Sequence, residues 1–317
     1  MVAIEDLQLL ADPWSALGEQ SSSDDWWTRR MRLHQTWWRT FRLGVPPGVG
    51  PSKTSTVRRG NMLDGAAAEA GLNFISPEAF QTYLDRLALS PVGVDPWRTS
   101  HNLLASQPLA FNVFGHLSHH LHLATGLFAD LLGQEEVAEA TSVEVERLSD
   151  ALGDHTAFDA FATYRRPDGS AGCVAIETKL TEPFSQQTYD WARYTGHSAF
   201  DPQVWATSEP EELGDLRWSQ LFRNHLLACA EVKVHPGLGE PMVLVVHHPA
   251  DRTCGTAVDG YRALLTEPDQ VRAVDLGRIA ASLESLVDAE TDTAWHAALC
   301  DRYLNLDLSA PLLDLPR

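Results

Sequence analysis

Residues 157–179 have the sequence AFDAFATYRRPDGSAGCVAIETK, and this stretch decides the fold. Two mostly apolar runs, Phe158 to Arg165 and Cys173 to Lys179, have the length and composition of β-strands. Between them stands Pro167-Asp168-Gly169, a combination typical of a tight turn. The stretch therefore predicts a β-hairpin.

Three charged residues interrupt this apolar hairpin. Burying the Asp159 carboxylate among phenylalanines is costly unless it has a partner, and the hairpin can bring Glu177 beside it. Lys179 lies two residues after Glu177, so in a strand it points to the same face. Two carboxylates suit Mg²⁺, and a lysine beside them can orient or deprotonate a water and offset charge on a phosphate. The spacing predicts a metal-dependent centre for phosphodiester hydrolysis.

The rest of the chain predicts strands before and after this hairpin and helices around them. Further strands are expected at Val137 to Arg147, Pro241 to His247 and Val271 to Asp275. Helices are expected at Ile4 to Ala11, from Ser23 or Asp24 to Leu43, near Met62 to Ala70, from Ser76-Pro77, from Pro108 to Leu132, at Phe184 to Tyr194, at Leu216 to Ala230 and over most of the tail from Thr256. This order predicts an α/β fold with a central mixed sheet flanked by helices.

The pattern of an aspartate, a hairpin turn and Glu-x-Lys resembles the PD-(D/E)XK nuclease superfamily. Further stretches resemble a bacterial subfamily of restriction-endonuclease-like nucleases, so that the likeness covers roughly residues 35 to 304; they are Arg59 to Leu63, Gly71 to Phe74, Asn102 to Gly115, Ala157 to Tyr164, Ile176 to Glu182, Gln220 to Leu226 and Arg302 to Leu304. The resemblance implies a restriction-endonuclease-like core with Asp159 and Glu177 as metal ligands. It also implies the backbone carbonyl of Thr178 as a third ligand and Lys179 as the catalytic lysine.

The resemblance also implies a further acidic ligand. Glu146 is our candidate, but Glu144 lies on the same predicted strand face and stays open as an alternative; Gln107 is a weaker candidate. The literal Pro-Asp of this chain includes Asp168, which we assign to the turn rather than to the metal.

Charge is unevenly distributed along the chain. The net charge is −19, yet residues 28–63 hold eight Lys and Arg and no acidic residue. We expect residues 1–100 to form an N-terminal helical extension with this basic segment, and residues 101–317 to form the nuclease-like core with a helical tail. On the first long helix Arg29, Arg32, Thr36 and Arg39 fall on one side and the tryptophans on the other. A solvated face and a phosphate-binding face explain this pattern equally well, and our DNA-contact candidates are Arg29, Arg32, Arg39, Arg58, Arg59 and Arg223.

Other residues point away from competing chemistries. The four cysteines are scattered, which argues against a cysteine zinc site and a disulfide framework. His116 and His120 are spaced to share a metal on a helix, but no third ligand is apparent, so ordinary histidines are favoured. No secretory signal, membrane-spanning run or phosphate-binding glycine loop is present, and we expect a cytoplasmic protein.

The sequence therefore predicts a Mg²⁺-dependent endonuclease that cuts DNA, with Mn²⁺ able to substitute. Restriction or phage defence is the context that the resemblance suggests. Two alternatives stay open: a binding or regulatory module on the same fold that does not cleave, and a nuclease acting on RNA or a small nucleotide. A homodimer would help to cut both strands, although no heptad or symmetric motif demonstrates one.

Overall fold

The computed structural model describes residues 12–90, 92–154, 156–187, 189, 191–206 and 210–315. The predicted helix from Ile4 to Ala11 lies outside these residues. None of the helices in the described part of the chain is both long and apolar enough to cross a membrane.

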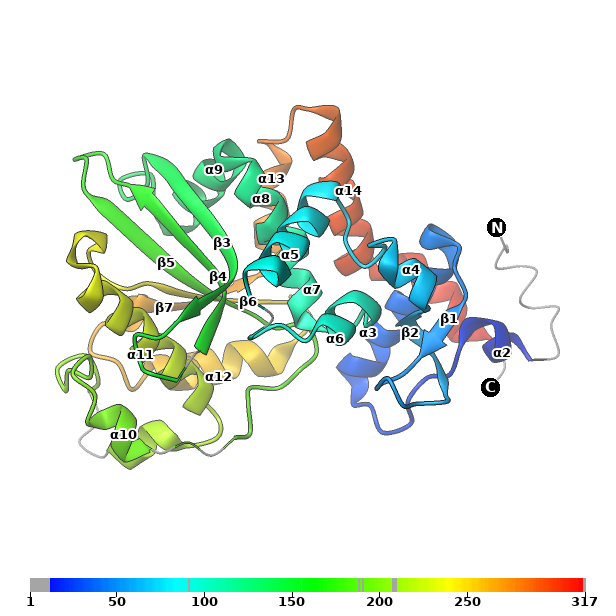
Figure 1. Ribbon diagram of the computed structural model, residues 1–317, viewed down its shortest axis with the longest axis horizontal. Coiled ribbons are helices and arrows are strands. Elements are labelled where there is room, and N and C mark those ends of the chain that lie inside the picture. Colours follow the sequence, from blue (N-terminus) through cyan, green and yellow to red (C-terminus); the bar gives the residue numbers. More distant parts are fainter. Residues whose placement is uncertain are drawn as a thin grey trace.

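The centre of the fold is a five-stranded sheet, as predicted. Its order is β3 (Glu139–Ser149), β4 (Thr156–Arg165), β5 (Ala171–Thr178), β6 (Val243–His247) and β7 (Val271–Asp275). The first three strands are antiparallel, whereas β5, β6 and β7 run parallel. The sheet is therefore mixed, and the α/β fold class is confirmed (Figure 1).

The hairpin that the sequence predicted joins β4 to β5. Ala160 lies opposite Ile176, and Tyr164 lies opposite Gly172. In the turn Gly169 has a φ of 87°, and the Asp168 carboxylate accepts hydrogen bonds from the backbone N–H and the hydroxyl of Ser170. Asp168 therefore has the local turn role that the sequence indicated.

Helices cover both faces of the sheet. On one face α9 (Leu121–Leu132) and α13 (Leu276–Glu284) pack on apolar side chains of β4, β5 and β6. On the other face α11 (Ser219–Val234) and α12 (Arg252–Arg262) bury the alternate side chains of the same strands. Figure 1 shows these two pairs of helices on opposite sides of the strands. This arrangement buries the middle of the hairpin from both sides.

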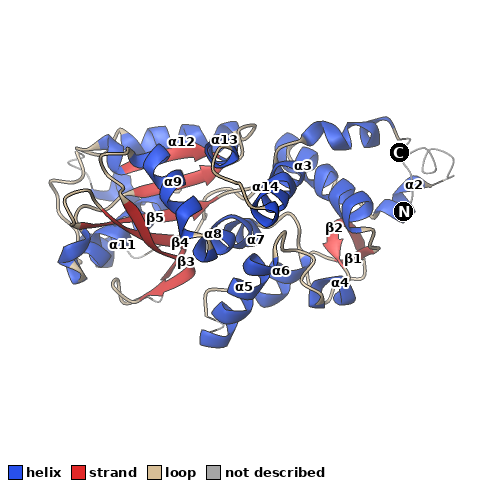
Figure 2. Ribbon diagram, turned by 90° about the horizontal axis from the view of Figure 1, so that it is seen from above, coloured by secondary structure: helices blue, strands red, loops and turns tan. Residues whose placement is uncertain are grey.

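The N-terminal elements form a second group at the other end of the molecule. Helix α5 (Pro77–Leu89) packs on β3, whereas the elements of the second group are α2 (Pro13–Leu17), α3 (Trp26–Trp37) with a π-helical continuation (Trp38–Leu43), the hairpin of β1 (Pro47–Val49) and β2 (Arg58–Leu63), α4 (Gly65–Glu69) and α6 (Pro96–His101). In both views α14 (Glu290–Tyr303) lies between them and the sheet (Figures 1 and 2).

The C-terminal tail holds α3 in place. The side chain of Gln35 donates to the carbonyl of Arg302, and that of Arg30 donates to the hydroxyl of Ser309, which lies in a 3₁₀ segment over Leu306–Asp314. The two ends of the chain thus pack together, while the division at residue 100 stays a prediction.

Four predicted helices differ from the structure. The helix expected near Met62 is only α4, because Met62 and Leu63 belong to β2 and Asp64 caps the helix that follows. The long helix from Pro108 is broken into α7 (Ser106–Ala110), a π-helical turn (Phe111–Gly115), α8 (His116–His119) and α9, with His120 in a non-helical conformation between the last two.

The other two differences lie at helix starts. The helix expected from Phe184 is confined to α10 (Trp191–Thr195), because the backbone of Ser185 instead donates its N–H to the side chain of Gln220. The cap of α3 is Asp25, one residue beyond the predicted Ser23 or Asp24, and its carboxylate accepts from the N–H of Thr28 at 2.7 Å.

Candidate active site

Asp159 lies against the end of β5. Its Oδ2 accepts from the backbone N–H of Thr178 at 2.7 Å and from the Thr178 hydroxyl at 2.8 Å. In the hairpin Ala160 lies opposite Ile176. The next pair of residues in this register is Asp159 on β4 and Glu177 on β5, so the two acids lie side by side. The structure therefore brings the two acids together as the hairpin predicted.

Glu177 and Lys179 are buried, with only 5% and 7% of each residue exposed. The Lys179 Nζ lies 2.7 Å from Glu177 Oε1 and 3.1 Å from the side-chain oxygen of Gln220. It also lies 5.1 Å from the centre of the Phe184 ring. Lys179 thus points to the same face as Glu177, where apolar packing and a hydrogen bond fix its ammonium group.

Helix α11 supplies two residues that hold Glu177 from the other side. Gln220 donates to Oε1 at 2.8 Å, and Asn224 donates to Oε2 at 2.7 Å. The sequence analysis assigned no role to Gln220 or Asn224. Their spacing of four residues, which places two side chains on one helix face, is the signal that could have found them.

Glu146 lies beside Asp159 from the other neighbouring strand. Val145 is opposite Ala160 and Arg147 is opposite Phe158, so the register sets Glu146 across from Asp159. Glu146 is only 3% exposed and has a φ of 51°, a left-handed conformation that is unfavourable for a residue with a side chain. We attribute its persistence to the contacts around it, including the hydrogen bond from Arg86 Nε to its carbonyl.

Glu144 and Gln107 were the other candidates for the further metal ligand, and neither side chain lies where that of Glu146 does. The carboxylate of Glu144 is exposed and lies 3.6 Å from Arg147 Nε. Gln107 donates its side-chain N–H to Glu146 Oε1 at 2.8 Å. The structure therefore places Glu146 near Asp159, leaves Glu144 at the surface and makes Gln107 a partner of Glu146.

The acids of this centre repel one another. Burial, followed by the nearby charge of Glu177, raises the pKa of Asp159 to about 7. Burial and then the charge of Asp159 raise the pKa of Glu146 well above its ordinary value. For Lys179 burial acts to lower the pKa, but Glu177 and Asp159 outweigh it and the pKa is raised. Asp159 and Glu177 thus share Lys179, the charge of Arg86 acts on Glu146, and a further cation would relieve the repulsion among the three acids.

The donor set fits a hard divalent cation, because all three side chains offer carboxylate oxygens. Their ligand oxygens do not all lie within 4.8 Å of one another, and both oxygens of Glu177 are hydrogen-bonded. An ion would therefore share Glu177 with Lys179 and draw the carboxylates together.

The arginines proposed to contact DNA donate most of their hydrogen bonds to other groups of the protein. Arg39 is 1% exposed, and its guanidinium donates to the carbonyls of Gly60, Val45 and Leu17. Thr36 is also buried, so the predicted exposed face of the helix is wrong at these two residues, because the hairpin of β1 and β2 packs over it. Arg39 is not on the surface and is unavailable to phosphate as placed.

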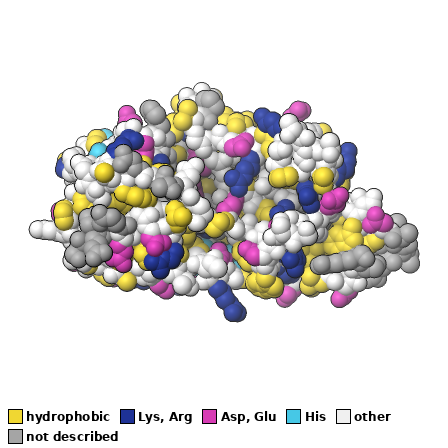
Figure 3. Space-filling view, turned by 90° about the horizontal axis from the view of Figure 1, so that it is seen from below, with side chains coloured by type: hydrophobic (Ala, Val, Ile, Leu, Met, Phe, Trp, Pro, Cys, Tyr) yellow, Lys and Arg dark blue, Asp and Glu magenta, His cyan; other side chains and the backbone are white. Residues whose placement is uncertain are grey.

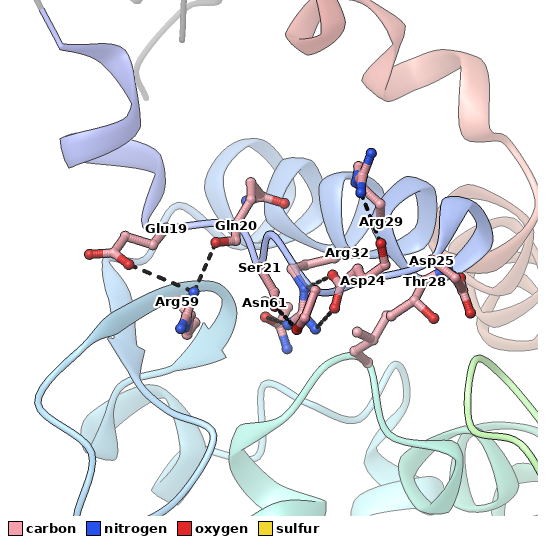
Figure 4. A network of polar contacts seen from close by, with 12 residues as sticks. Glu19, Gln20, Ser21, Asp24, Asp25, Thr28, Arg29, Arg32, Arg59 and Asn61 are labelled. Atoms are coloured by element: carbon pink, nitrogen blue, oxygen red, sulfur yellow. Dashed lines mark hydrogen bonds and ion pairs between the residues drawn. The ribbon is translucent and has the colours of Figure 1, made fainter.

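The other arginines lie nearer the surface (Figure 4). Arg32 pairs with Asp24 at 2.5 Å and donates to Asn61 at 2.6 Å, and Arg29 donates to the carbonyl of Asp24. Arg59 donates to the carbonyl of Gln20, and Arg58 donates to that of Pro47 while its side chain stays exposed.

Arg223 lies apart from these residues, on α11. It pairs with Asp154 at 3.3 Å and its guanidinium lies over the ring of Tyr189. Arg223, which the sequence analysis named as a DNA-contact candidate, thus has an acidic neighbour in the structure.

A groove lies between part of the basic segment and the residues that follow β5. It has a volume of about 340 Å³, and its lining includes Arg32, Arg59, Arg98, Thr181 and Glu182. The indole N–H of Trp27 donates to the carbonyl of Leu180 at 2.8 Å, which fastens α3 to the residues just after Lys179. Figure 3 shows a hollow between the two ends of the molecule, with basic and acidic side chains inside it.

Comparison with known proteins gives one match. A family model described as the PD-(D/E)XK nuclease superfamily matches residues 22–305, which is most of the chain and includes the N-terminal elements from α3 onward. No curated protein and no solved structure matches this chain.

Proposed function

This chain belongs to the PD-(D/E)XK nuclease superfamily, and on that premise we propose that it is a Mg²⁺-dependent endonuclease that hydrolyses phosphodiester bonds in DNA. The observation that carries the proposal is the group formed by the half-buried Asp159 and the buried Glu177 and Lys179, with the buried Glu146 beside them. Buried ion pairs are a poor route to stability, so a purely structural role explains this group less well than chemistry does.

Each acid has a role in holding the metal. Asp159 and Glu177 would bind Mg²⁺ together with the carbonyl of Thr178, while Glu146 would complete the shell directly or through a water. Bound Mg²⁺, or Mn²⁺ in its place, supplies Lewis-acid stabilisation of the charge that develops on the phosphate.

Lys179 would orient the attacking water and offset negative charge on the phosphate. Its ammonium group is held by Glu177 and Gln220, so it needs little reorganisation to act. Gln220 is therefore a positioning residue, because it contacts both the acid and the lysine.

The groove beside residues 181–182 is the route that we propose for the DNA backbone. Arg32 and Arg59 line it directly, whereas Arg29 and Arg58 line two other hollows of the N-terminal group. Restriction or phage defence, a cytoplasmic location and a homodimer that cuts both strands complete the proposal.

One observation favours a second function. Lys179, Glu177 and Gln220 satisfy one another without a metal, as they would in a module that binds nucleic acid and does not cleave it. RNA or a small nucleotide is the remaining substrate class.

Cleavage of supercoiled and linear DNA with Mg²⁺ or Mn²⁺ tests the proposal. We expect metal-dependent cutting by the wild type and its loss in Lys179→Ala and Asp159→Asn. The matched controls are Lys233→Ala, at an exposed position of α11, and Asp168→Asn, in the exposed turn. Both controls should cut like the wild type.

If the wild type binds DNA or RNA but cuts neither, the catalytic proposal fails and the binding module replaces it. Competition at rising salt separates the substrates, since a long duplex gives a steep salt dependence and a small nucleotide a shallow one. If Asp168→Asn no longer cuts while Asp159→Asn still does, the metal ligand would be Asp168 in the turn and not Asp159.

A further inference from the structure

A second cluster of ligating side chains lies away from the catalytic hairpin, around Asp292 at the start of α14. Residues from three other elements meet it: Glu78 of α5, the histidines around the break between α8 and α9, and Asp288 just before α14. The cluster shares no residue with the centre formed by β4, β5 and α11.

Asp292 is a buried carboxylate whose described ion-pair partners are all histidines. It is 1% exposed; its Oδ1 lies 3.2 Å from His116 Nε2 and 3.2 Å from His120 Nδ1, and its Oδ2 lies 3.9 Å from His122 Nε2. Among the described residues no lysine or arginine pairs with Asp292, although most buried carboxylates have such a partner or a metal.

The buried histidine of the cluster lies behind Asp292. His116 is fully buried, stacks on Trp295 at 4.0 Å and faces Glu78 through its other nitrogen at 3.5 Å. Each ring nitrogen of His116 therefore already faces a carboxylate. Asp292 thus has imidazoles and no guanidinium or ammonium group among its described ion-pair partners, and a cation would complete its surroundings.

Ring orientation decides which side chains can share an ion. His116 and His120 are stacked, with an interplanar angle of 12° and centres 4.3 Å apart, so the in-plane lone pairs of the two rings cannot converge on one point. His120 and His122 instead meet at 62° with centres 6.0 Å apart. Ligand atoms of His122, Asp288 and Asp292 all lie within 4.8 Å of one another.

We propose that His120, His122, Asp288 and Asp292 form a zinc site. Two imidazoles and two carboxylates are a ligand set that Zn²⁺ accepts in tetrahedral geometry. Bonds of about 2.0 to 2.2 Å require the ligand atoms to approach to about 3.4 Å, so the exposed His122 and Asp288 side chains would move toward the ion on binding. His116, itself facing Glu78, orients Asp292 from behind.

The ion would have a structural role, because it would link two helices that belong to different parts of the fold. Helix α9 packs on β3, whereas the far end of α14 bears Asp301 and Arg302, which bind α3 through His34 and Gln35. Zinc between the starts of α9 and α14 would link the sheet to the helix that carries the N-terminal group. No third ligand for His116 and His120 was apparent from the sequence, because Asp288 and Asp292 lie more than a hundred residues further on.

Calorimetric titration of ZnCl₂ into the metal-free full chain tests the site, with thermal unfolding as a second measurement. The double variant His122→Ala/Asp288→Asn changes only exposed side chains, so its fold should persist. Asp159→Asn is the matched control, because it alters the catalytic centre alone. We expect the wild type and Asp159→Asn to bind one zinc ion with similar affinity and to unfold at a higher temperature with zinc.

The double variant should bind zinc at least about 100-fold more weakly, since it loses two direct ligands. It should also gain no thermal stability from the ion. Zinc binding by the double variant at wild-type affinity, or loss of binding in Asp159→Asn alone, would overturn the proposal by placing the ion in the catalytic centre. Absence of zinc binding by the wild type would overturn it as well.

Discussion

The β4–β5 hairpin and the basic segment at residues 28–63 are both rich in charge, but they use it in opposite ways. In the hairpin centre Asp159 and Glu177 share Lys179 while Glu146 faces Arg86, so three acids meet in a largely buried place. In the basic segment backbone carbonyls and Asp24 accept most of the arginine hydrogen bonds that we described.

The difference shows that charge density in a sequence is a poor guide to charge that is available for binding. Eight basic residues without an acidic neighbour in the chain suggested an open phosphate-binding surface. Folding satisfied Arg39 completely with internal carbonyls. Three acids scattered over 32 positions of the chain, by contrast, converged and left a demand for a cation.

The largest expected effect is that of Lys179→Met, which removes the cation that faces Glu177 and Asp159. Cleavage should fall by about 10²- to 10³-fold, because charge on the phosphate loses its fixed partner. The buried Glu177 would also lose its counter-charge, at a cost of about 3 to 5 kcal/mol in the free energy of unfolding. Denaturant unfolding with and without Mg²⁺ measures this cost, and unchanged stability in the absence of metal would contradict the pairing.

Arg39→Ala probes the opposite region. Three internal carbonyls would lose a charged donor, and we expect a loss of about 3 kcal/mol in the free energy of unfolding. The salt dependence of DNA binding by the folded variant should stay at the wild-type slope. A shallower slope would show that Arg39 contacts phosphate after all and would weaken the contrast between the regions.

Glu146→Gln tests the choice between the two acids on β3. We expect cleavage to fall by about 10- to 100-fold, as for other groups that support a metal, with no loss of thermal stability because like-charge repulsion is relieved. Glu144→Gln, two residues away and exposed, is the control and should cut normally. Equal activity of the two variants would remove Glu146 from the site.

The smallest effect is expected for Arg58→Ala. Its side chain is exposed and donates to one carbonyl, so stability should change by no more than about 0.5 kcal/mol. If Arg58 contacts a phosphate, the slope of log affinity against log salt should fall by about 0.9. An unchanged slope would leave the groove residues Arg32 and Arg59 as the arginines to test next.

The sequence predicted the strands better than it predicted the helices. Alternating and apolar runs, with Pro167-Asp168-Gly169 between two of them, indicated the hairpin and all five strands of the sheet. Helix lengths failed where a distant residue competes for the backbone, as Gln220 does at Ser185, and where His120 interrupts an otherwise helical run.

What the sequence by itself determined is the pairing of Asp159, Glu177 and Lys179, because strand periodicity and one turn fix which side chains of a hairpin share a face. Only the tertiary structure decided which acid of β3 joins them, that Gln220 and Asn224 hold Glu177, that Arg39 is internal and that Asp292 gathers three histidines. The reason is physical: local periodicity sets the direction of a side chain, whereas its partners come from elements far away in the chain, and packing alone brings them within bonding distance.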